Sequence, residues 1–166
     1  GKRWRPFLTV CAYKALREED SDAPIPADLR KVAVAVECFH KASLIHDDIE
    51  DADATRYGER TMHEEHGVAV ALNVGDFLLG EGYRLLAESG APATTVVAML
   101  RAAADGHRTL SLGQGAELLW TRGPKPLSSL QVLDIFRQKT APAFEVALVI
   151  GALYAGDLDD ELQETL

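Results

Sequence analysis

The sequence contains little that would support a disulfide scaffold, a membrane span or a strand-rich fold. Its two cysteines, Cys11 and Cys38, each stand among apolar neighbours, which is typical of buried free thiols and too few for a disulfide framework. The apolar run of residues 146–155 is too short to cross a bilayer, and no signal peptide is recognisable at the charged start. These absences favour a soluble, cytoplasmic protein.

Positive charge is also scarce. The chain has 17 Lys and Arg against 26 Asp and Glu, and its net charge of -9 argues against a nucleic-acid partner, which needs a dense basic surface. Within this acidic background the basic residues 1–6, GKRWRP, stand out. A length of 166 residues with 47% apolar residues suits a single folded domain over 1–166.

Long segments free of Gly and Pro predict helices. The alternation of Val and Ala over 32–36 is a strand signal, but it lies inside 27–51, a stretch without breakers that is too long for a typical strand. Ser128 and Gln131 make a capping box, and Pro142 should kink the helix that follows. We expect an all-α bundle with helices over residues 4–18, 27–51, 68–89, 93–120 and 128–154 and a last short segment near Leu158.

The segment with the clearest chemical signal is residues 40–51. Asp47 and Asp51 are four residues apart, so on a helix their carboxylates share one face and repel each other. A hard cation relieves such repulsion, and Mg²⁺ in particular takes one or two carboxylates together with water and phosphate oxygens. Because the acidic run follows an apolar stretch, we expect these carboxylates over the end of a largely buried helix, in contrast to a solvated acidic face.

The residues Asp47-Asp48-Ile49-Glu50-Asp51 resemble the first aspartate-rich motif, DDxxD, of the trans-isoprenyl (polyprenyl) diphosphate synthases. Other landmarks of that family follow in its order along the whole chain. They are residues 1–6, Gly58, Thr61, Gly67, 73–76, Gly113, Gln114 and 138–140. The resemblance implies an isoprenoid-synthase-type helical bundle, of which this chain would be about the first half.

The same resemblance implies a Mg²⁺-dependent head-to-tail condensation. In that family, Mg²⁺ ions held by aspartates promote the departure of the diphosphate of an allylic prenyl diphosphate, and the double bond of isopentenyl diphosphate attacks the remaining cation. By position, Asp47 and Asp51 would be metal ligands, with Asp48 in support. The residues implied for isopentenyl diphosphate are Lys2, Arg5 and His40, and those implied for the allylic diphosphate are Arg56, Lys139 and Thr140. A homodimer is expected as well.

Some of these residues have simpler interpretations. His40 could be a core histidine bonded to a backbone carbonyl, Lys139 a helix-surface lysine, and Thr140 a helix residue bonded to its own turn. Upstream of the acidic motif, Ala42 and Ser43 are small and leave room for a prenyl tail, which Val36 and Phe39 could close one turn further back. We therefore expect a product of C20 or longer.

Two departures from the family pattern leave several explanations open. Tyr57 stands where a second arginine is usual, which weakens the isopentenyl diphosphate site or indicates another substrate. The second aspartate-rich motif is missing, since residues 157–160 come too early and are interpreted as a loop or cap. The chain is then either a piece of a complete synthase, which we favour, or a half-length relative that works, or merely binds, with a partner chain.

Two further alternatives concern function. A terpene cyclase built on this fold would act on one allylic diphosphate, and Tyr57 mildly favours it whereas Lys2, Arg5 and His40 oppose it. A non-catalytic regulatory subunit would not need to retain Asp47, Asp51, Arg56, Lys139 and Thr140 in a bundle. If the chain is a piece, the apolar segments 32–39 and 146–150 would need cover from further helices or a second chain.

Overall fold

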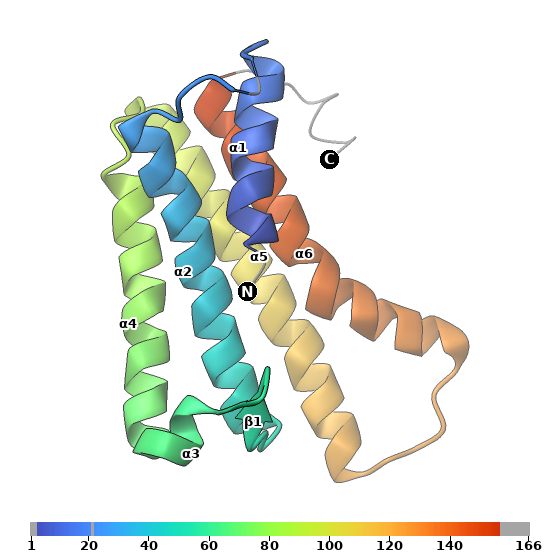
Figure 1. The fold of residues 1–166 in the computed structure, drawn as a ribbon. Helices are drawn as coiled ribbons and strands as arrows, with labels where there is room; N and C mark the ends of the chain where they lie inside the picture. The colour runs from blue at the N-terminus through green and yellow to red at the C-terminus, as the bar shows by residue number, and fades with distance from the viewer. Residues whose placement is uncertain (1–2, 21, 157–166) are drawn as a thin grey trace.

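Helices account for most of the computed structural model, which describes residues 3–20 and 22–156 (Figure 1). In chain order they are α1 (Trp4–Leu16), α2 (Ala27–Glu50), α3 (Met62–His66), α4 (Val68–Ala87), α5 (Ala93–Arg122) and α6 (Ser129–Ala155). The all-α fold predicted from the sequence is confirmed, and so are its five long helices, to within a few residues at their ends. The expected segment near Leu158 and residues 157–160 lie outside the described residues.

A small antiparallel hairpin was missed by the sequence analysis. Strands β1 (Thr55–Arg56) and β2 (Glu59–Arg60) are joined by Tyr57 and Gly58, whose φ angles are 54° and 88°. Positive φ at both central residues is what a two-residue type I′ hairpin requires. The turn was not predicted because Tyr rarely adopts this conformation, whereas Asn and Gly adopt it readily.

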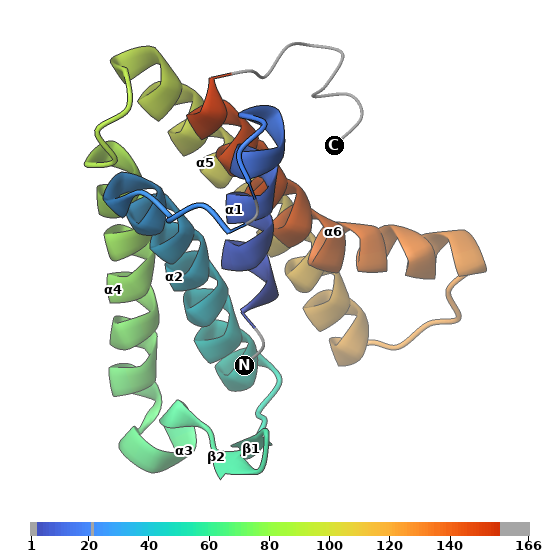
Figure 2. The same cartoon turned by 45° about the horizontal axis from the view of Figure 1, so that its top comes forward.

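Local signals explain where the helices begin and bend. The predicted capping box is present: Gln131 N donates to Ser128 Oγ at 3.3 Å, and Ser128 N donates to Gln131 Oε1 at 2.9 Å. α6 continues through Pro142, and its ribbon changes direction along its length (Figures 1 and 2). α2 and α5 begin directly after Pro26 and Pro92, which fix the entering backbone.

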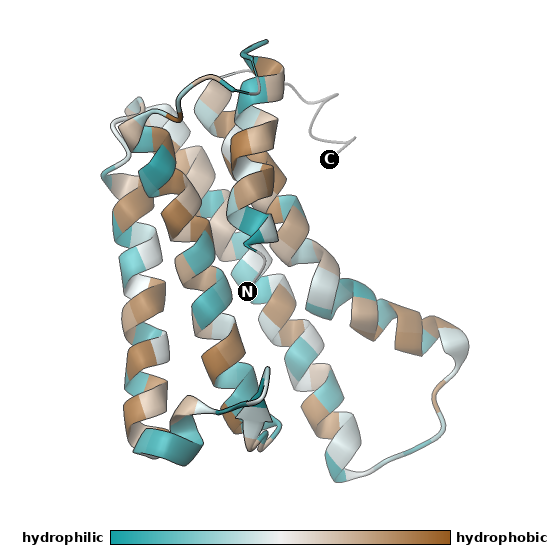
Figure 3. Ribbon diagram, viewed as in Figure 1, coloured by the Kyte–Doolittle hydropathy of each residue, from teal (hydrophilic) through white to brown (hydrophobic). Residues whose placement is uncertain are grey.

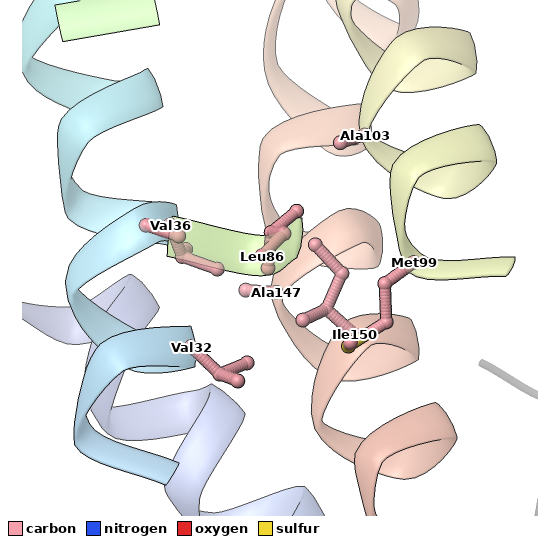
Figure 4. Packing of buried hydrophobic residues seen from close by; sticks show 8 residues of the cluster. Val32, Val36, Leu86, Met99, Ala103, Ala147 and Ile150 are labelled. Carbon is pink, nitrogen blue, oxygen red and sulfur yellow. The ribbon is translucent and has the colours of Figure 1, made fainter. Parts of the chain in front are cut away.

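The core lies where α2, α4, α5 and α6 meet. Polar and apolar residues are interleaved along each helix, so only inner faces contribute (Figure 3). The buried cluster consists of Val32, Ala35, Val36, Leu86, Met99, Ala103, Ala147 and Ile150 (Figure 4). Most of the segments 32–39 and 146–150 is thus buried within this chain, so our expectation that they need cover from elsewhere was wrong except at Val34, which is 51% exposed.

α2 and α4 pack side by side and bring the acidic motif into a fixed orientation (Figure 1). Gly75 of α4 is buried, and a Cβ at this position would lie 2.2 Å from His46 Nε2. The imidazole of His46 therefore occupies the space that any larger residue at 75 would need. None of the helices within residues 3–20 and 22–156 is long and apolar enough to span a membrane.

Candidate active site

A cavity of about 230 Å³ lies between α1, α2, α5 and α6. It is lined by Arg5, His40, Ser43, Leu44, Asp47, Leu110, Gln114, Lys139, Thr140 and Ala143. Five residues predicted as site residues from distant parts of the sequence, Arg5, His40, Asp47, Lys139 and Thr140, therefore meet around one space. Lys2 lies outside the described residues.

Asp47 contributes a half-buried carboxylate to this cavity. Burial raises the pKa of Asp47 to about 6, Lys139 and Arg56 act in the opposite direction, and the charges of Glu50 and Asp51 add to the increase. Asp51 follows α2 directly as its C-cap and is exposed. A positive charge close to Asp47 would relieve both the desolvation and the repulsion, which is what a bound cation supplies.

Asp48 has a different environment from its two neighbours in the motif. It is buried, and its Oδ1 lies 2.5 Å from both Nε and Nη2 of Arg56. Arg56 also lies 3.7 Å from Asp53, measured between Nη2 and Oδ2. Because Arg56 is the last residue of β1, this ion pair ties the hairpin to the end of α2. Neither Asp48 nor Arg56 lines the cavity within the described residues.

Lys139 reaches the cavity from α6 and is held by α5. Its Nζ donates to Glu117 Oε2 at 2.5 Å. Partial burial lowers the pKa of Lys139, but the bond to Glu117 and the charges of Asp51 and Asp47 outweigh it, so the pKa is raised. Lys139 is therefore a charged, positioned side chain rather than a freely solvated helix lysine. Thr140, beside it, is exposed and lines the same cavity.

Gln114 and Glu117 of α5 are the site residues that sequence reasoning missed. Gln114 was noted only as part of a family landmark, yet its Nε2 donates to Asp51 Oδ1 at 3.4 Å. The preceding Gly113 allows close contact between helices, since a Cβ there would lie 2.8 Å from the backbone N of Lys139. Glu117 lies three residues further along the same helix face, and this spacing was the signal that could have suggested it.

Arg5 and His40 form a pair on the other side of the cavity. Arg5 Nη1 lies 2.9 Å from His40 Nε2, and because a guanidinium only donates, the imidazole accepts at Nε2 and is neutral. Burial lowers the pKa of His40 to about 4, and the charges of Arg5, Lys41 and Arg56 contribute. Arg5 also lies over the ring of Phe144, 4.8 Å from its centroid. The imidazole of His40 is thus bonded to Arg5, a charged residue of the cavity, and not to a backbone carbonyl of the core.

A smaller cavity of about 40 Å³ adjoins the first and shares Arg5 and His40 with it. Val36 and Phe39 line it, as expected from the sequence, together with His107 of α5. The Phe39 ring packs edge-on against Tyr83, with 4.9 Å between centroids, and against His107 at 5.9 Å. Phe39 is therefore a braced aromatic wall behind the site.

The oxygen ligands available in the site suit Mg²⁺. No three His, Cys, Asp or Glu side chains form a metal cage in the part of the chain that the structure describes. Mg²⁺ does not need such a cage, because it commonly takes one or two carboxylates and completes its shell with water and substrate phosphates. Asp47 and Asp51, with the otherwise unpartnered oxygen of Gln114 beside them, match that requirement.

Comparisons with known proteins agree on one family. The family described as polyprenyl synthetase matches residues 1–166. Geranylgeranyl pyrophosphate synthase 7, chloroplastic, from Arabidopsis thaliana is 38% identical, covering 99% of this chain and 47% of that protein. The short chain isoprenyl diphosphate synthase of Methanocaldococcus jannaschii is 33% identical, covering 100% of this chain and 48% of that protein.

Solved structures give the same result. The geranylgeranyl pyrophosphate synthetase of the archaeon Geoglobus acetivorans superposes with a TM-score of 0.87 at 29% identity, over 99% of this chain and 51% of that one. A Helicobacter pylori geranyltransferase complexed with magnesium and isoprenyl diphosphate has a TM-score of 0.86 at 26% identity, over 99% of this chain and 55% of that one. The chain thus spans about half the length of the curated relatives it matches. It belongs to the polyprenyl synthetase family.

Proposed function

We propose that this chain supplies the first acidic motif and much of the substrate cavity of a Mg²⁺-dependent prenyltransferase. The reaction is the head-to-tail condensation of an allylic prenyl diphosphate with isopentenyl diphosphate to a longer prenyl diphosphate. The observation that carries the proposal is the cavity in which Asp47 faces Lys139 and the Arg5–His40 pair. The acidic residues suit a cation and the basic residues suit phosphate, as a metal-dependent diphosphate reaction requires.

Asp47 and Asp51 are the proposed ligands of Mg²⁺. The metal, when bound, supplies positive charge that stabilises a departing diphosphate. A bound cation would stabilise the charged form of Asp47 in particular, because burial penalises that form. Asp48 has a different role in the proposal: its bond to Arg56 fixes the loop after α2, so that Asp47 and Asp51 keep their orientation.

Lys139 and Thr140 are the proposed contacts for the allylic diphosphate. Lys139 is held in the cavity by Glu117, and Thr140 offers a hydroxyl from the next position of α6. Arg56 is included as a second basic contact, although its guanidinium is bonded to Asp48. An ammonium and a guanidinium stabilise charge that develops on a leaving diphosphate most strongly where water is excluded.

Arg5, His40 and Lys2 are the proposed contacts for isopentenyl diphosphate. Arg5 is half-buried, and its Nε has no partner among the described residues, so it has donor capacity left for a phosphate oxygen. His40 accepts from Arg5 and so orients that guanidinium. Such preorganised donors lose little conformational freedom when an anion binds.

The prenyl tail is proposed to extend from the cavity past Ser43 towards Phe39. Ser43 lines both the larger and the smaller cavity, and Ala42 beside it is small and buried. The aromatic group at the far end of this path is Phe39, which lines the smaller cavity two helical turns before Asp47. This distance supports a product of C20 or longer.

A homodimer is part of the proposal. Large apolar side chains remain exposed on α4 and α5, among them Phe77 at 66% and Leu119 at 73%. Such a surface is usually covered in solution. We expect Phe77→Asp to shift the sedimentation coefficient of the complete protein towards that of a monomer, and an unchanged value would remove this support.

Cytoplasmic location stays a prediction, since one relative is named chloroplastic.

The proposal is tested with Asp47→Asn and Asp51→Asn in the complete gene product. Each substitution keeps the shape of the side chain and removes a charged oxygen ligand. We expect each to lower Mg²⁺-dependent kcat by at least about 100-fold, because each ~1.4 kcal/mol of lost transition-state stabilisation costs tenfold in rate. The control is Asp134→Asn, on the exposed face of α6. Near-normal activity of either site variant would contradict the proposal.

A further inference from the structure

Gln114 has an unusual environment for an amide side chain. It is 8% exposed, on the face of α5 that lines the larger cavity. Its Nε2 donates to Asp51 Oδ1 at 3.4 Å. Its Oε1 is buried and has no hydrogen-bond partner within residues 3–20 and 22–156. Buried amide oxygens are nearly always paired in native proteins, so this one indicates a missing donor.

The orientation of the amide follows from its neighbour. A carboxylate only accepts hydrogen bonds, so the NH₂ group of Gln114 must face Asp51 and the carbonyl oxygen must face away from it. Turning the amide over would bring two oxygens together and leave the NH₂ group unused. The free acceptor is therefore a consequence of the bond to Asp51.

The groups that line or enter the cavity limit which kind of donor can reach Gln114 Oε1. Lys139 lines the cavity from α6, and its ammonium is directed to Glu117 and has no hydrogen bond to Gln114 within the described residues. An ionised diphosphate carries acceptor oxygens and offers no proton to Gln114. A divalent cation does offer a donor, because the water molecules of its hydration shell donate hydrogen bonds outward.

The backbone holds Gln114 in place. At the preceding Gly113, a Cβ would lie 2.8 Å from the Lys139 backbone N and 2.9 Å from Gln138 Cβ. The two helices are thus in direct contact, and α5 cannot move towards α6 to bury the free oxygen elsewhere. Gln114 is thus held next to the contact between α5 and α6, where it lines the cavity.

We propose that Gln114 is a positioning residue of the cation site, which orients Asp51 through its NH₂ group and accepts a hydrogen bond from cation-bound water through its carbonyl oxygen. This inference rests on the proposed function and deepens it. Partners of this kind around a metal site commonly change metal affinity by about 10- to 100-fold when they are removed.

The test is a titration of the complete protein with Mn²⁺ in the presence of inorganic diphosphate, followed by electron paramagnetic resonance of the free ion. Gln114→Met keeps the length of the side chain and removes both hydrogen bonds. We expect it to weaken Mn²⁺ binding about tenfold. Gln114→Glu keeps an acceptor oxygen but loses the NH₂ donor to Asp51, and we expect it to recover only part of the affinity. Gln131→Met is the matched control, because it makes the same change at the exposed start of α6, outside both cavities.

Each result has a defined meaning. Mn²⁺ affinity of Gln114→Met equal to that of the unchanged protein would overturn the inference, and so would Gln114→Glu binding as weakly as Gln114→Met. If Gln114→Met does not fold, as judged by circular dichroism, Gln114→Leu takes its place in the same comparison. Asp51→Asn distinguishes a failure of the proposed function from a failure of the role of Gln114. Normal Mn²⁺ binding by that variant would contradict the proposed function itself. Loss of binding in Asp51→Asn but not in Gln114→Met would contradict only the role of Gln114.

Discussion

Arg56 neutralises Asp48, with its Nε and Nη2 both 2.5 Å from the same carboxylate oxygen. Asp47 and Asp51, on either side of Asp48 in the motif, have no ion-pair partner within 4 Å in the described part of the chain. The acidic run is thus divided into one paired carboxylate with a structural role and two that remain available for a cation. The predictions below follow from this division and from the residues around it.

Asp48→Asn should lower the free energy of unfolding by about 1–3 kcal/mol, because it leaves Arg56 without its buried partner. Arg56→Gln should have the larger effect, since it leaves the buried Asp48 carboxylate without its partner, whereas Arg56 is the more exposed of the two. Urea unfolding of the single and double variants measures the coupling between them. Additive effects would show that the pair contributes no interaction energy.

The stability of the protein should depend on pH through His40. Its pKa is about 4 in the folded state, against an ordinary value of 6.5, so between these values the unfolded state binds the extra proton. Stability should therefore fall as the pH is lowered from 6.5 towards 4. Asp47 acts in the opposite direction, because its pKa is raised to about 6 and its protonation favours the folded state.

The comparison that isolates His40 uses Asp47→Asn as the background. In that variant the free energy of unfolding should decrease from pH 7 to pH 4.5, as measured by urea titration. Adding His40→Gln should remove part of the slope, because the amide does not titrate. The same slope with and without His40 would contradict the assignment.

Tyr57→Arg should lower the KM for isopentenyl diphosphate about two- to fivefold, the range of one exposed charge contact. Tyr57 is 82% exposed and close enough to Arg5 to affect its pKa, so an arginine there would add charge near the proposed phosphate contacts. Tyr57→Asn is the control, because Asn tolerates positive φ and adds no charge. Equal KM values for the Arg and Asn variants would show that position 57 does not face this substrate.

Phe39→Ala should lengthen the product, because it removes the aromatic wall that Tyr83 and His107 brace. The measurement is chromatography of the dephosphorylated products. Phe136→Ala, on an exposed part of α6, should leave the product distribution unchanged. Products of the same length from Phe39→Ala and the unchanged protein would show that the tail is limited elsewhere.

The sequence was sufficient to predict the five long helices because Gly and Pro mark their ends and apolar spacing marks their inner faces, whereas the short helix α3 was not predicted. The hairpin after α2 was not predicted, because its turn contains Tyr57 at a φ that Tyr seldom adopts. The family motifs identified the residues around the cavity, including Arg5, His40 and Lys139. They did not indicate which acidic residue was already paired.

The missed contacts have a common cause. Gln114 and Asp51 are 63 positions apart, and Lys139 and Glu117 are 22 apart, on different helices. Such pairs depend on how helices pack, which local periodicity does not encode. The close approach at Gly113 is what brings the backbone of Lys139 up to α5, and a glycine inside a helix gave no sign of its partner.

The most direct test of the account is the reaction itself. The complete gene product is incubated with Mg²⁺, an allylic prenyl diphosphate and labelled isopentenyl diphosphate, and the products are separated by chain length. We predict labelled prenyl diphosphates extended by five-carbon units, with activity lost when a chelator removes Mg²⁺ and lost in Asp47→Asn. An unlabelled cyclic hydrocarbon formed from the allylic substrate, or no product at all, would contradict the proposed condensation.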